Sequence, residues 1–236
     1  MQKVEKNHLL LQNWERLSFM HWEVDKRKLT KYLPSGLELD FFRGKTYVGV
    51  IPFFMKGVRP RWGFSLPFIS SFPEFNIRIY VKHHNISGVY FITLDAQSFT
   101  SFLYANLFFK LPYMFSRGSV KTDKNINYWK TNRLTGDHKL EGFCEGYGDE
   151  LTAGKGTIEE FLLERYYLFT QKNGRIYRGL VDHSPWKYRL ARPRIIQNSF
   201  LESYDLGIKD YHHPDFCYIA NSVEVKAWAL EESIYN

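Results

Sequence analysis

Residues 72–97 alternate between apolar and polar side chains with a period of two. This period is typical of β-strands that bury one face. The pattern predicts a hairpin with its turn within residues 83–88. Its aliphatic face is predicted to hold Phe75, Ile77, Ile79, Val81, Tyr90, Ile92, Leu94 and Ala96. Its polar face is predicted to hold Glu74, Asn76, Arg78, Tyr80, Lys82, Val89, Phe91, Thr93 and Asp95.

The register of this hairpin follows from keeping every aliphatic side chain on one side. It places Arg78 opposite Thr93. Asn76 then faces Asp95, which lies diagonally from Arg78 and within its reach. Glu74 lies about 13 Å from Arg78 along the strand, too far for a direct ion pair unless the strand bends. The polar face is either a solvated sheet surface or the wall of an amphipathic cavity, and its aromatic members leave both interpretations open.

Strand-like segments and turn signals continue along the rest of the chain, with few helices between them. Capping residues predict a helix that follows Asp25 and another that begins at Thr157, with Glu160 as its reciprocal partner. Asn173 and Gly174 form the strongest turn dipeptide for a hairpin. The other predicted segments are a buried helix over residues 98–110, a long loop over 57–73 and a polar connection over 117–124.

No segment changes composition enough to mark a linker, and no internal repeat is visible. The simplest account is one domain, residues 1–236, of the α+β class, with mostly antiparallel strands and two or three helices. Aromatic residues make up 18% of the chain, which favours strands and large side chains around a core or a pocket. The formal charge of +7 is compatible with an anionic partner and is also ordinary for solubility.

Cysteine usage and apolar runs bear on the cellular compartment. Cys144 and Cys217 stand alone in strand-like segments, which predicts reduced core thiols in a cytosolic protein. The first residues lack the long apolar core of a signal peptide. The most lipid-like run, residues 102–115, is too short to span a bilayer and contains Lys110 and Pro112. We therefore expect a cytoplasmic protein that does not cross a membrane.

Short motifs recur in order over most of residues 14–190. They are LSFMHW at 17–22, LPSGLELD at 33–40, IPF and GVRP within 51–60, FPEFNIRIYV at 72–81, GV and LDA within 88–96, LPY at 111–113, FLLERY at 161–166 and HSPW at 183–186. With these motifs the chain resembles the YqjF-like family of conserved bacterial proteins, whose function is not established.

The YqjF-like family is in turn similar to acetoacetate decarboxylase. This resemblance implies a mostly antiparallel, strongly bent sheet or cone around an inner cavity. The decarboxylase forms a Schiff base through one of two adjacent lysines that follow a Phe-Pro. The comparable segment here is FKLPYM at 109–114, where Tyr113 and Met114 stand at the lysine pair and Lys110 is out of register. The resemblance therefore implies the cavity without the Schiff-base lysine.

The polar face of the hairpin supplies the first candidates for a binding site. Arg78 could hold a carboxylate or a phosphate, with Asp95 beside it. A partly buried Glu74 could carry a proton. Tyr80 shares their face and could line the same cavity. The alternative is an internal ion pair that fixes the register of the sheet.

Further candidates come from other segments. Tyr113 could donate a hydrogen bond to a carbonyl, although a tyrosine after proline more often packs. Glu164 and Arg165 lie where a helix turns into a strand, and we interpret them first as a structural salt bridge. His21 and His183 could titrate near neutrality, although a satisfied core or surface histidine is the commoner case. The predicted ligand-binding set is Glu74, Arg78, Tyr80, Asp95, Tyr113, Glu164, Arg165 and His183.

Metal and cofactor motifs are not found in the sequence. His83–His84 and His212–His213 are adjacent pairs, whose side chains point apart on an extended chain, and neither has a third ligand nearby. No HExxH, GxSxG, P-loop or dinucleotide glycine motif occurs. We therefore predict no metal site and no cofactor.

The segment 186–194 supports a second hypothesis. Its basic and aromatic residues, Trp186, Lys187, Tyr188, Arg189, Arg192 and Arg194, fit a groove that follows phosphates. Charge runs are usually solvated, so nucleic acid is not the partner we expect.

The leading hypothesis is an inner cavity that binds a small, anionic organic molecule, and whether a reaction is catalysed stays open. The alternative is a non-enzymatic interaction module that uses residues 186–194 against nucleic acid or an acidic protein. A homo-oligomer is compatible with either hypothesis.

Overall fold

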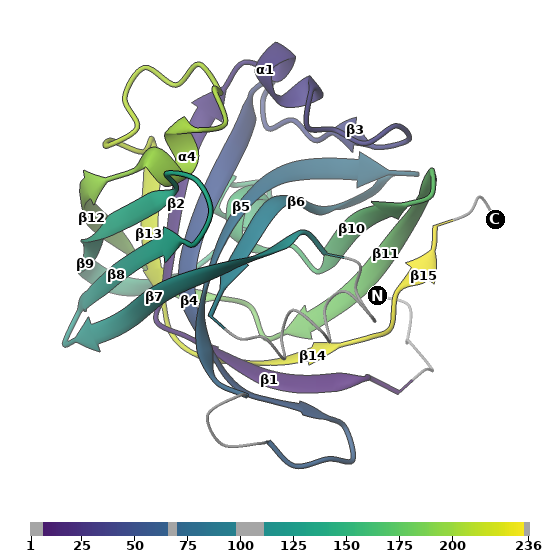
Figure 1. Ribbon diagram of the computed structural model, residues 1–236, viewed down its shortest axis with the longest axis horizontal. Helices are drawn as coiled ribbons and strands as arrows, with labels where there is room; N and C mark the ends of the chain where they lie inside the picture. Colours follow the sequence, from purple (N-terminus) through teal and green to yellow (C-terminus); the bar gives the residue numbers. More distant parts are fainter. Residues whose placement is uncertain (1–6, 66–69, 98–110, 234–236) are drawn as a thin grey trace.

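The computed structural model describes residues 7–65, 70–97 and 111–233. Their strands form one mixed sheet in which only the pairs β6–β10 and β6–β7 are parallel (Figure 1). The strands are β1 (Leu10–Glu15), β2 (Leu17–Val24), β3 (Glu38–Leu39), β4 (Thr46–Pro60), β5 (Phe72–His83), β6 (Ile86–Ala96), β7 (Tyr113–Asp123), β8 (Ile126–Arg133), β9 (Lys139–Thr152), β10 (Tyr167–Lys172), β11 (Arg175–His183), β12 (Lys187–Gln197), β13 (Phe216–Ala220), β14 (Val223–Ala227) and β15 (Glu231–Glu232). The helices described are α1 (Lys26–Thr30), α3 (Ile158–Leu163) and α4 (Ser199–Glu202). The predicted class, α+β with mostly antiparallel strands, is confirmed.

The strand pairings close the sheet on itself twice. The first ring runs through β1, β14, β11, β10, β6, β5 and β4 and returns to β1. The second ring runs from β6 through β7, β8, β9, β12, β13, β2 and β4 to β5 and back to β6. Strands β4, β5 and β6 belong to both rings and form the wall between them (Figure 1). Both faces of β5 are therefore buried, and the solvated interpretation of its polar face was wrong.

The hairpin predicted for residues 72–97 is present as β5 and β6. His84 and Asn85 form its two-residue turn with φ angles of 48° and 63°, as a type I′ turn requires. The predicted register was wrong, because Arg78 pairs with Phe91 and not with Thr93.

A β-bulge divides β6 into two halves. Ile92 is the extra residue, opposite the step from Ile77 to Arg78. Because a bulge adds one residue to a period of two, the side chains beyond it lie on the face opposite to the one that simple alternation predicts. Asp95 therefore pairs with Phe75 and shares the face of Phe75. The prediction that Asp95 lies beside Arg78 was wrong for this reason.

The two faces of β5 pack into different rings. Its aliphatic face belongs to a hydrophobic core in the second ring, together with large side chains such as Trp22 and Trp129. Its polar face, with Glu74, Asn76 and Arg78, lies inside the first ring. The alternation of apolar and polar residues along β5 thus places its aliphatic side chains in the core and its polar side chains in the pocket.

Capping and turn predictions were accurate where the signals are local. Asp25 accepts a hydrogen bond from a backbone N–H at the start of α1, and Thr157 does the same for Glu160 at the start of α3. The carboxylate of Glu160 accepts from the N–H of Gly156, so the reciprocal cap lies one residue before Thr157. Residues 173–174 form the predicted turn between β10 and β11.

Other expectations need correction. Residues 117–124 were expected to form a polar connection, but residues up to Asp123 belong to strand β7, which pairs with β8. The loop expected at 57–73 is shorter, because β4 continues to Pro60 and β5 begins at Phe72. The helix predicted at 98–110 lies outside the described residues.

The two cysteines are buried thiols, as predicted, with the sulfur atoms of Cys144 and Cys217 3.4 Å apart. Among the helices that the structure describes, none has the length and apolar content needed to cross a membrane.

Candidate ligand pocket

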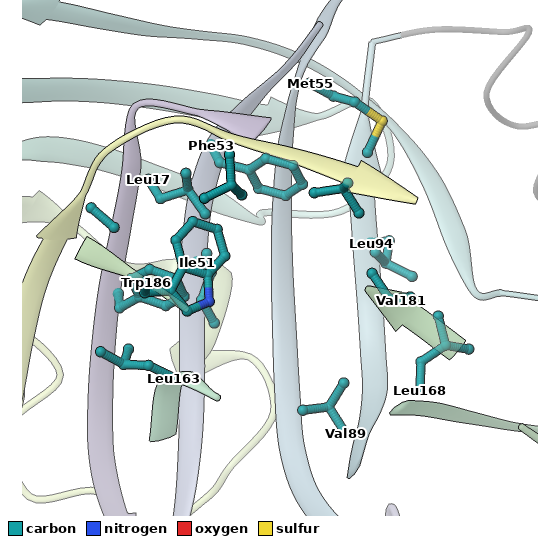
Figure 2. Close-up of a cluster of buried hydrophobic side chains, with 14 of the residues drawn as sticks. Leu17, Ile51, Phe53, Met55, Val89, Leu94, Leu163, Leu168, Val181 and Trp186 are labelled. Carbon is teal, nitrogen blue, oxygen red and sulfur yellow. The ribbon is translucent and has the colours of Figure 1, made fainter. Parts of the chain in front are cut away.

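A pocket of about 130 Å³ lies inside the first ring. Most of its wall is apolar, and Figure 2 shows these side chains gathered between the strands. They include Leu17, Ile51, Phe53, Met55, Val89, Leu94, Leu163, Leu168, Val181 and Trp186. A cavity of about 150 Å³ holds benzene, so this pocket has room for a molecule of about six non-hydrogen atoms.

Few polar side chains reach this wall. They are Gln12, Glu74, Asn76, Arg78, Tyr113, Arg165, Tyr167 and His183. The structure thus brings together five members of the predicted set, namely Glu74, Arg78, Tyr113, Arg165 and His183. Tyr80, Asp95 and Glu164 are not among the lining residues.

Arg78 extends from β5 and is 9% exposed. Its Nη2 donates to the carbonyl oxygen of Leu162 at 2.8 Å and to the hydroxyl of Tyr80 at 3.2 Å. The guanidinium also lies 5.6 Å from the ring centre of Phe19. All of these partners are neutral, and no carboxylate of the described residues pairs with Arg78. A buried cation with only neutral partners favours the approach of an anion.

Arg165 lines the same pocket but is already neutralised. Its Nη1 lies 2.7 Å from Asp40, and its Nε donates to the carbonyl oxygen of Phe161. Burial lowers the pKa of Arg165, and the charge of Asp40 opposes this shift. Asp40 also pairs with Lys82 at 2.9 Å. The salt bridge expected for Arg165 is therefore present, with a partner that is distant in the sequence.

Glu74 is the titratable acid of the pocket. The hydroxyl of Tyr113 donates to its carboxylate at 2.7 Å. Burial raises the pKa of Glu74 to about 7, although hydrogen bonds from Tyr113 and Asn76 act in the opposite direction. Burial also raises the pKa of Tyr113 well above its ordinary value, so that Tyr113 remains a donor. A carboxyl group with a pKa near 7 can give or take a proton at neutral pH.

His183 ends β11 and is 8% exposed. Its Nδ1 lies 2.8 Å from the carbonyl oxygen of Ser184. Because a carbonyl oxygen only accepts, Nδ1 carries the proton of the neutral ring and Nε2 is an acceptor. Burial lowers the pKa of His183, which favours this neutral form. The rings of Tyr166 and Trp186 each lie 4.8 Å from the imidazole.

Tyr80 and Glu164 are not lining residues, but both form hydrogen bonds with residues that line the pocket. The Tyr80 hydroxyl donates to the carbonyl oxygen of Leu162 at 2.9 Å, the same oxygen that binds Arg78. Glu164 accepts hydrogen bonds from the hydroxyl of Tyr166 and from the N–H of Trp186. These contacts orient Arg78 and the residues around His183.

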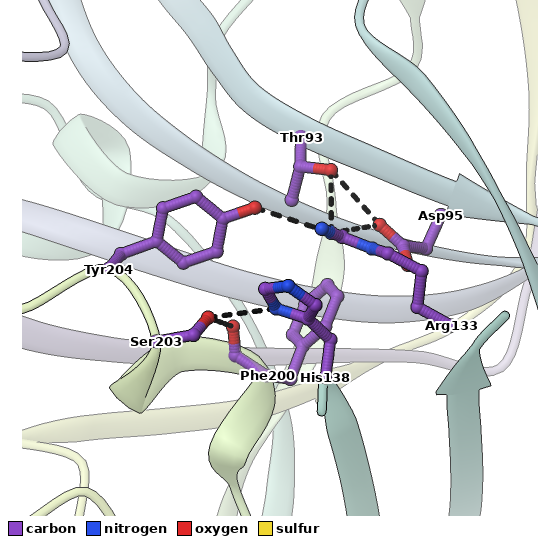
Figure 3. A network of polar contacts seen from close by, with 7 residues as sticks. All are labelled: Thr93, Asp95, Arg133, His138, Phe200, Ser203 and Tyr204. Carbon is purple, nitrogen blue, oxygen red and sulfur yellow. Dashed lines mark hydrogen bonds and ion pairs between the residues drawn. The ribbon is translucent and has the colours of Figure 1, made fainter. Parts of the chain in front are cut away.

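Asp95 belongs to a polar network on the opposite face of the hairpin (Figure 3). Arg133 donates to both of its carboxylate oxygens, at 2.8 and 2.7 Å. The same guanidinium contacts the hydroxyl groups of Thr93 at 2.9 Å and Tyr204 at 3.2 Å. Asp95 therefore forms an internal ion pair, the alternative considered for the polar face of the hairpin. Its partner is Arg133, which the sequence did not indicate.

Some pocket residues were missed by the sequence analysis. Gln12 and Trp14 lie on β1, a strand whose inward positions alternate from Leu10. That alternation was the available signal. The indole N–H of Trp14 and the side-chain oxygen of Asn76 are buried without hydrogen-bond partners in the described part of the chain. His21 does not line the pocket but contacts Tyr80, with its Nε2 2.8 Å from the Tyr80 hydroxyl.

The basic segment 186–194 does not present its aromatic rings to solvent. Trp186 lines the pocket and Tyr188 packs on Tyr218 at 5.2 Å. The basic residues Lys187, Arg189, Arg192 and Arg194 are exposed on β12. Strand alternation separates the two kinds of side chain, so the expected surface for stacking bases is absent from this segment.

Residues 11–224 match the family DUF2071, described as an uncharacterized conserved protein. The chain belongs to the DUF2071 family. This DUF2071 protein is 29% identical over 227 residues to the uncharacterized protein YqjF of Bacillus subtilis. The aligned region covers 95% of this chain and 92% of YqjF. The resemblance to YqjF-like proteins is confirmed.

Solved structures of acetoacetate decarboxylase type share the fold of this DUF2071 protein. The enduracididine biosynthesis enzyme MppR matches with a TM-score of 0.67 at 10% identity, covering 98% of this chain and 92% of MppR. Acetoacetate decarboxylase from Legionella pneumophila matches with a TM-score of 0.66 at 10% identity, covering 100% and 94%. An acetoacetate decarboxylase-like enzyme from Sphingomonas wittichii matches with 0.67 at 12%, covering 97% and 95%. At this level of identity, these matches establish the fold alone.

The pocket residues differ from a Schiff-base site in one respect. No lysine occurs among the lining residues within the described ranges. Tyr113, which stands at the place expected of the lysine pair, lines the pocket and binds Glu74.

Proposed function

We propose that this protein binds a small carboxylate in the pocket of the first ring, with Arg78 as the group that holds the carboxylate. The observation that supports this proposal is the buried guanidinium of Arg78, whose partners are all neutral. Hydrogen bonds to a charged group contribute about 1.5–3 kcal/mol. A carboxylate ligand would supply the missing countercharge.

The rest of the pocket restricts the ligand further. Arg165 is neutralised by Asp40, and burial raises the pKa of Glu74 so that its protonated form is neutral. With Glu74 protonated, Arg78 is the free positive charge among the described lining residues, which suits a monoanion. The apolar lining and the volume of about 130 Å³ favour a short carbon skeleton. Glu74, with its pKa of about 7, is the group that would exchange a proton with such a ligand.

The relatives that share the fold are consistent with a small organic acid. MppR has been observed with pyruvate and with a condensation product of pyruvate, and acetoacetate decarboxylase is named for another short carboxylic acid. We do not extend Schiff-base chemistry to this chain, because Tyr113 stands where the lysine is expected.

Thermal-shift measurements with short carboxylates and their matched amides test the proposal. We expect the carboxylates to raise the melting temperature of the wild type and the amides to leave it unchanged, because binding to the folded state stabilises it. Arg78→Met should largely remove the shift at the same ligand concentration, because its affinity for a carboxylate is expected to fall by a factor of about 10–100. Arg194→Met is the matched control, because Arg194 is exposed on β12. A full shift in Arg78→Met, or none in the wild type, would contradict the proposal.

A further inference from the structure

We infer that the ligand carries a hydroxyl group besides its carboxylate, and that Nε2 of His183 accepts the hydrogen bond from that hydroxyl. The inference rests on the proposed function, because both groups would occupy the same pocket. It names a substrate class, the short hydroxycarboxylates, and gives a role to His183.

The two groups lie on different walls of the first ring. Arg78 is on β5 and His183 ends β11, and β6 and β10 lie between these strands on the shorter path around the ring. Both side chains line the pocket. The charge of Arg78 contributes to the lowered pKa of His183, after the larger effect of burial, so the two groups are close enough to interact across the pocket. We therefore expect a short molecule held by Arg78 at one end to present a second polar group to His183.

The hydrogen bonding of His183 defines what that second group must be. Its Nδ1 hydrogen is used by the carbonyl oxygen of Ser184, and Nε2 has no partner among the described residues. The imidazole is held in place by the stacked ring of Tyr166 and by Trp186. Glu164 fixes both of these neighbours. The ring therefore presents a fixed acceptor, and the ligand must bring a donor.

A hydroxyl fits this acceptor better than the other common donors. A carboxylate alone has only acceptor atoms and would leave Nε2 unsatisfied. An ammonium group would enter a wall that carries the free charge of Arg78. Of the nearby carboxylates, Asp40 is already shared by Arg165 and Lys82. Glu74 already accepts from Tyr113, and burial raises its pKa to about 7, so it offers at most a partial negative charge at neutral pH. A neutral O–H donor avoids this repulsion.

Isothermal titration with pairs of acids that differ by one hydroxyl tests the inference. The pairs are glycolate against acetate and lactate against propionate. We expect the wild type to bind the hydroxy acid about tenfold more tightly, the effect of one satisfied buried hydrogen bond. His183→Leu should lose this preference while still binding the simple acid. His183→Gln should keep part of it, because an amide oxygen can accept. His213→Leu, which removes an exposed histidine, is the control and should keep the full preference.

A measurement on the wild type avoids any effect of substitution on folding. Nitrogen-15 NMR should show His183 with a proton on Nδ1 and a bare Nε2, and the hydroxy acid should shift the Nε2 resonance more than the simple acid does. A proton on Nε2, or equal affinity for both acids of each pair, would overturn the inference. Failure of the proposed function is different, since neither acid would then bind or binding would not depend on Arg78.

Discussion

Arg78 and Arg133 are two arginines buried against opposite faces of the β5–β6 hairpin, and they differ in their partners. Arg133, in the second ring, makes a two-pronged ion pair with Asp95, and their side chains are 5% and 0% exposed. Arg78, in the first ring, contacts a carbonyl oxygen, a hydroxyl and aromatic rings. The first pair completes a core, whereas the second arginine leaves its charge available to a pocket.

The difference in partners distinguishes an arginine that stabilises the fold, Arg133, from one whose charge is available to a ligand, Arg78. Removing one member of a fully buried ion pair leaves an uncompensated charge, which is strongly destabilising. Removing an arginine that has no countercharge removes a desolvation cost as well as its hydrogen bonds. The two faces of one hairpin should therefore respond differently to substitution.

The largest effect is expected for Asp95→Asn. The change leaves Arg133 buried without its countercharge and should lower the free energy of unfolding by about 3–5 kcal/mol. Urea denaturation measures this loss. Asp25→Asn is the control, because the ion pair of Asp25 with Arg27 is exposed and asparagine still caps a helix; no measurable change is expected. A loss below about 1 kcal/mol in Asp95→Asn would show that the network in Figure 3 contributes little.

The pH dependence of stability should report Glu74. Its pKa is raised from 4.5 to about 7, so between these values the folded state binds a proton that the unfolded state has released. Stability should therefore be fully present below pH 4.5 and fall as pH rises toward 7, by about 3 kcal/mol in total.

Glu74→Gln should remove this part of the pH profile and be more stable than the wild type at pH 8. Urea denaturation at pH 5 and pH 8 compares the two proteins. Identical slopes for variant and wild type would show that Glu74 titrates near its ordinary value.

Arg78→Met should separate stability from binding. We expect its free energy of unfolding to stay within about 1 kcal/mol of the wild type, because no buried countercharge is left behind. Its affinity for a carboxylate should fall by a factor of about 10–100. A destabilisation as large as that of Asp95→Asn would mean that the two arginines have the same structural role.

The smallest effect, a null result, is expected from borohydride. Reduction in the presence of a keto acid should add no mass to the protein, because Tyr113 stands at the expected position of the Schiff-base lysine. Intact-mass spectrometry followed by peptide mapping reads the outcome. A trapped adduct on Lys110 would show that the alignment around Pro112 is displaced.

The polar face of β5 illustrates how far sequence reasoning reached toward the site. Glu74 and Arg78 were found because alternation puts them on the face opposite to the aliphatic residues, and both line the pocket. Asp95 was misplaced because the bulge at Ile92 reverses the alternation, and no local signal marks that bulge. His183 was a candidate, but its position in the same pocket depends on β11 closing the first ring.

By itself the sequence determined the hairpin of β5 and β6, the turn at residues 173–174, the caps of α1 and α3 and the separation of the polar and aliphatic faces of β5. These features depend on contacts between residues close in the chain, where side-chain period and backbone preference act directly. Only the tertiary structure decided that both faces of β5 are buried, that Asp95 binds Arg133 and that Arg78 lines the pocket. Those outcomes depend on which distant strands pair, and ring closure and cross-strand register are set by the packing of the whole chain.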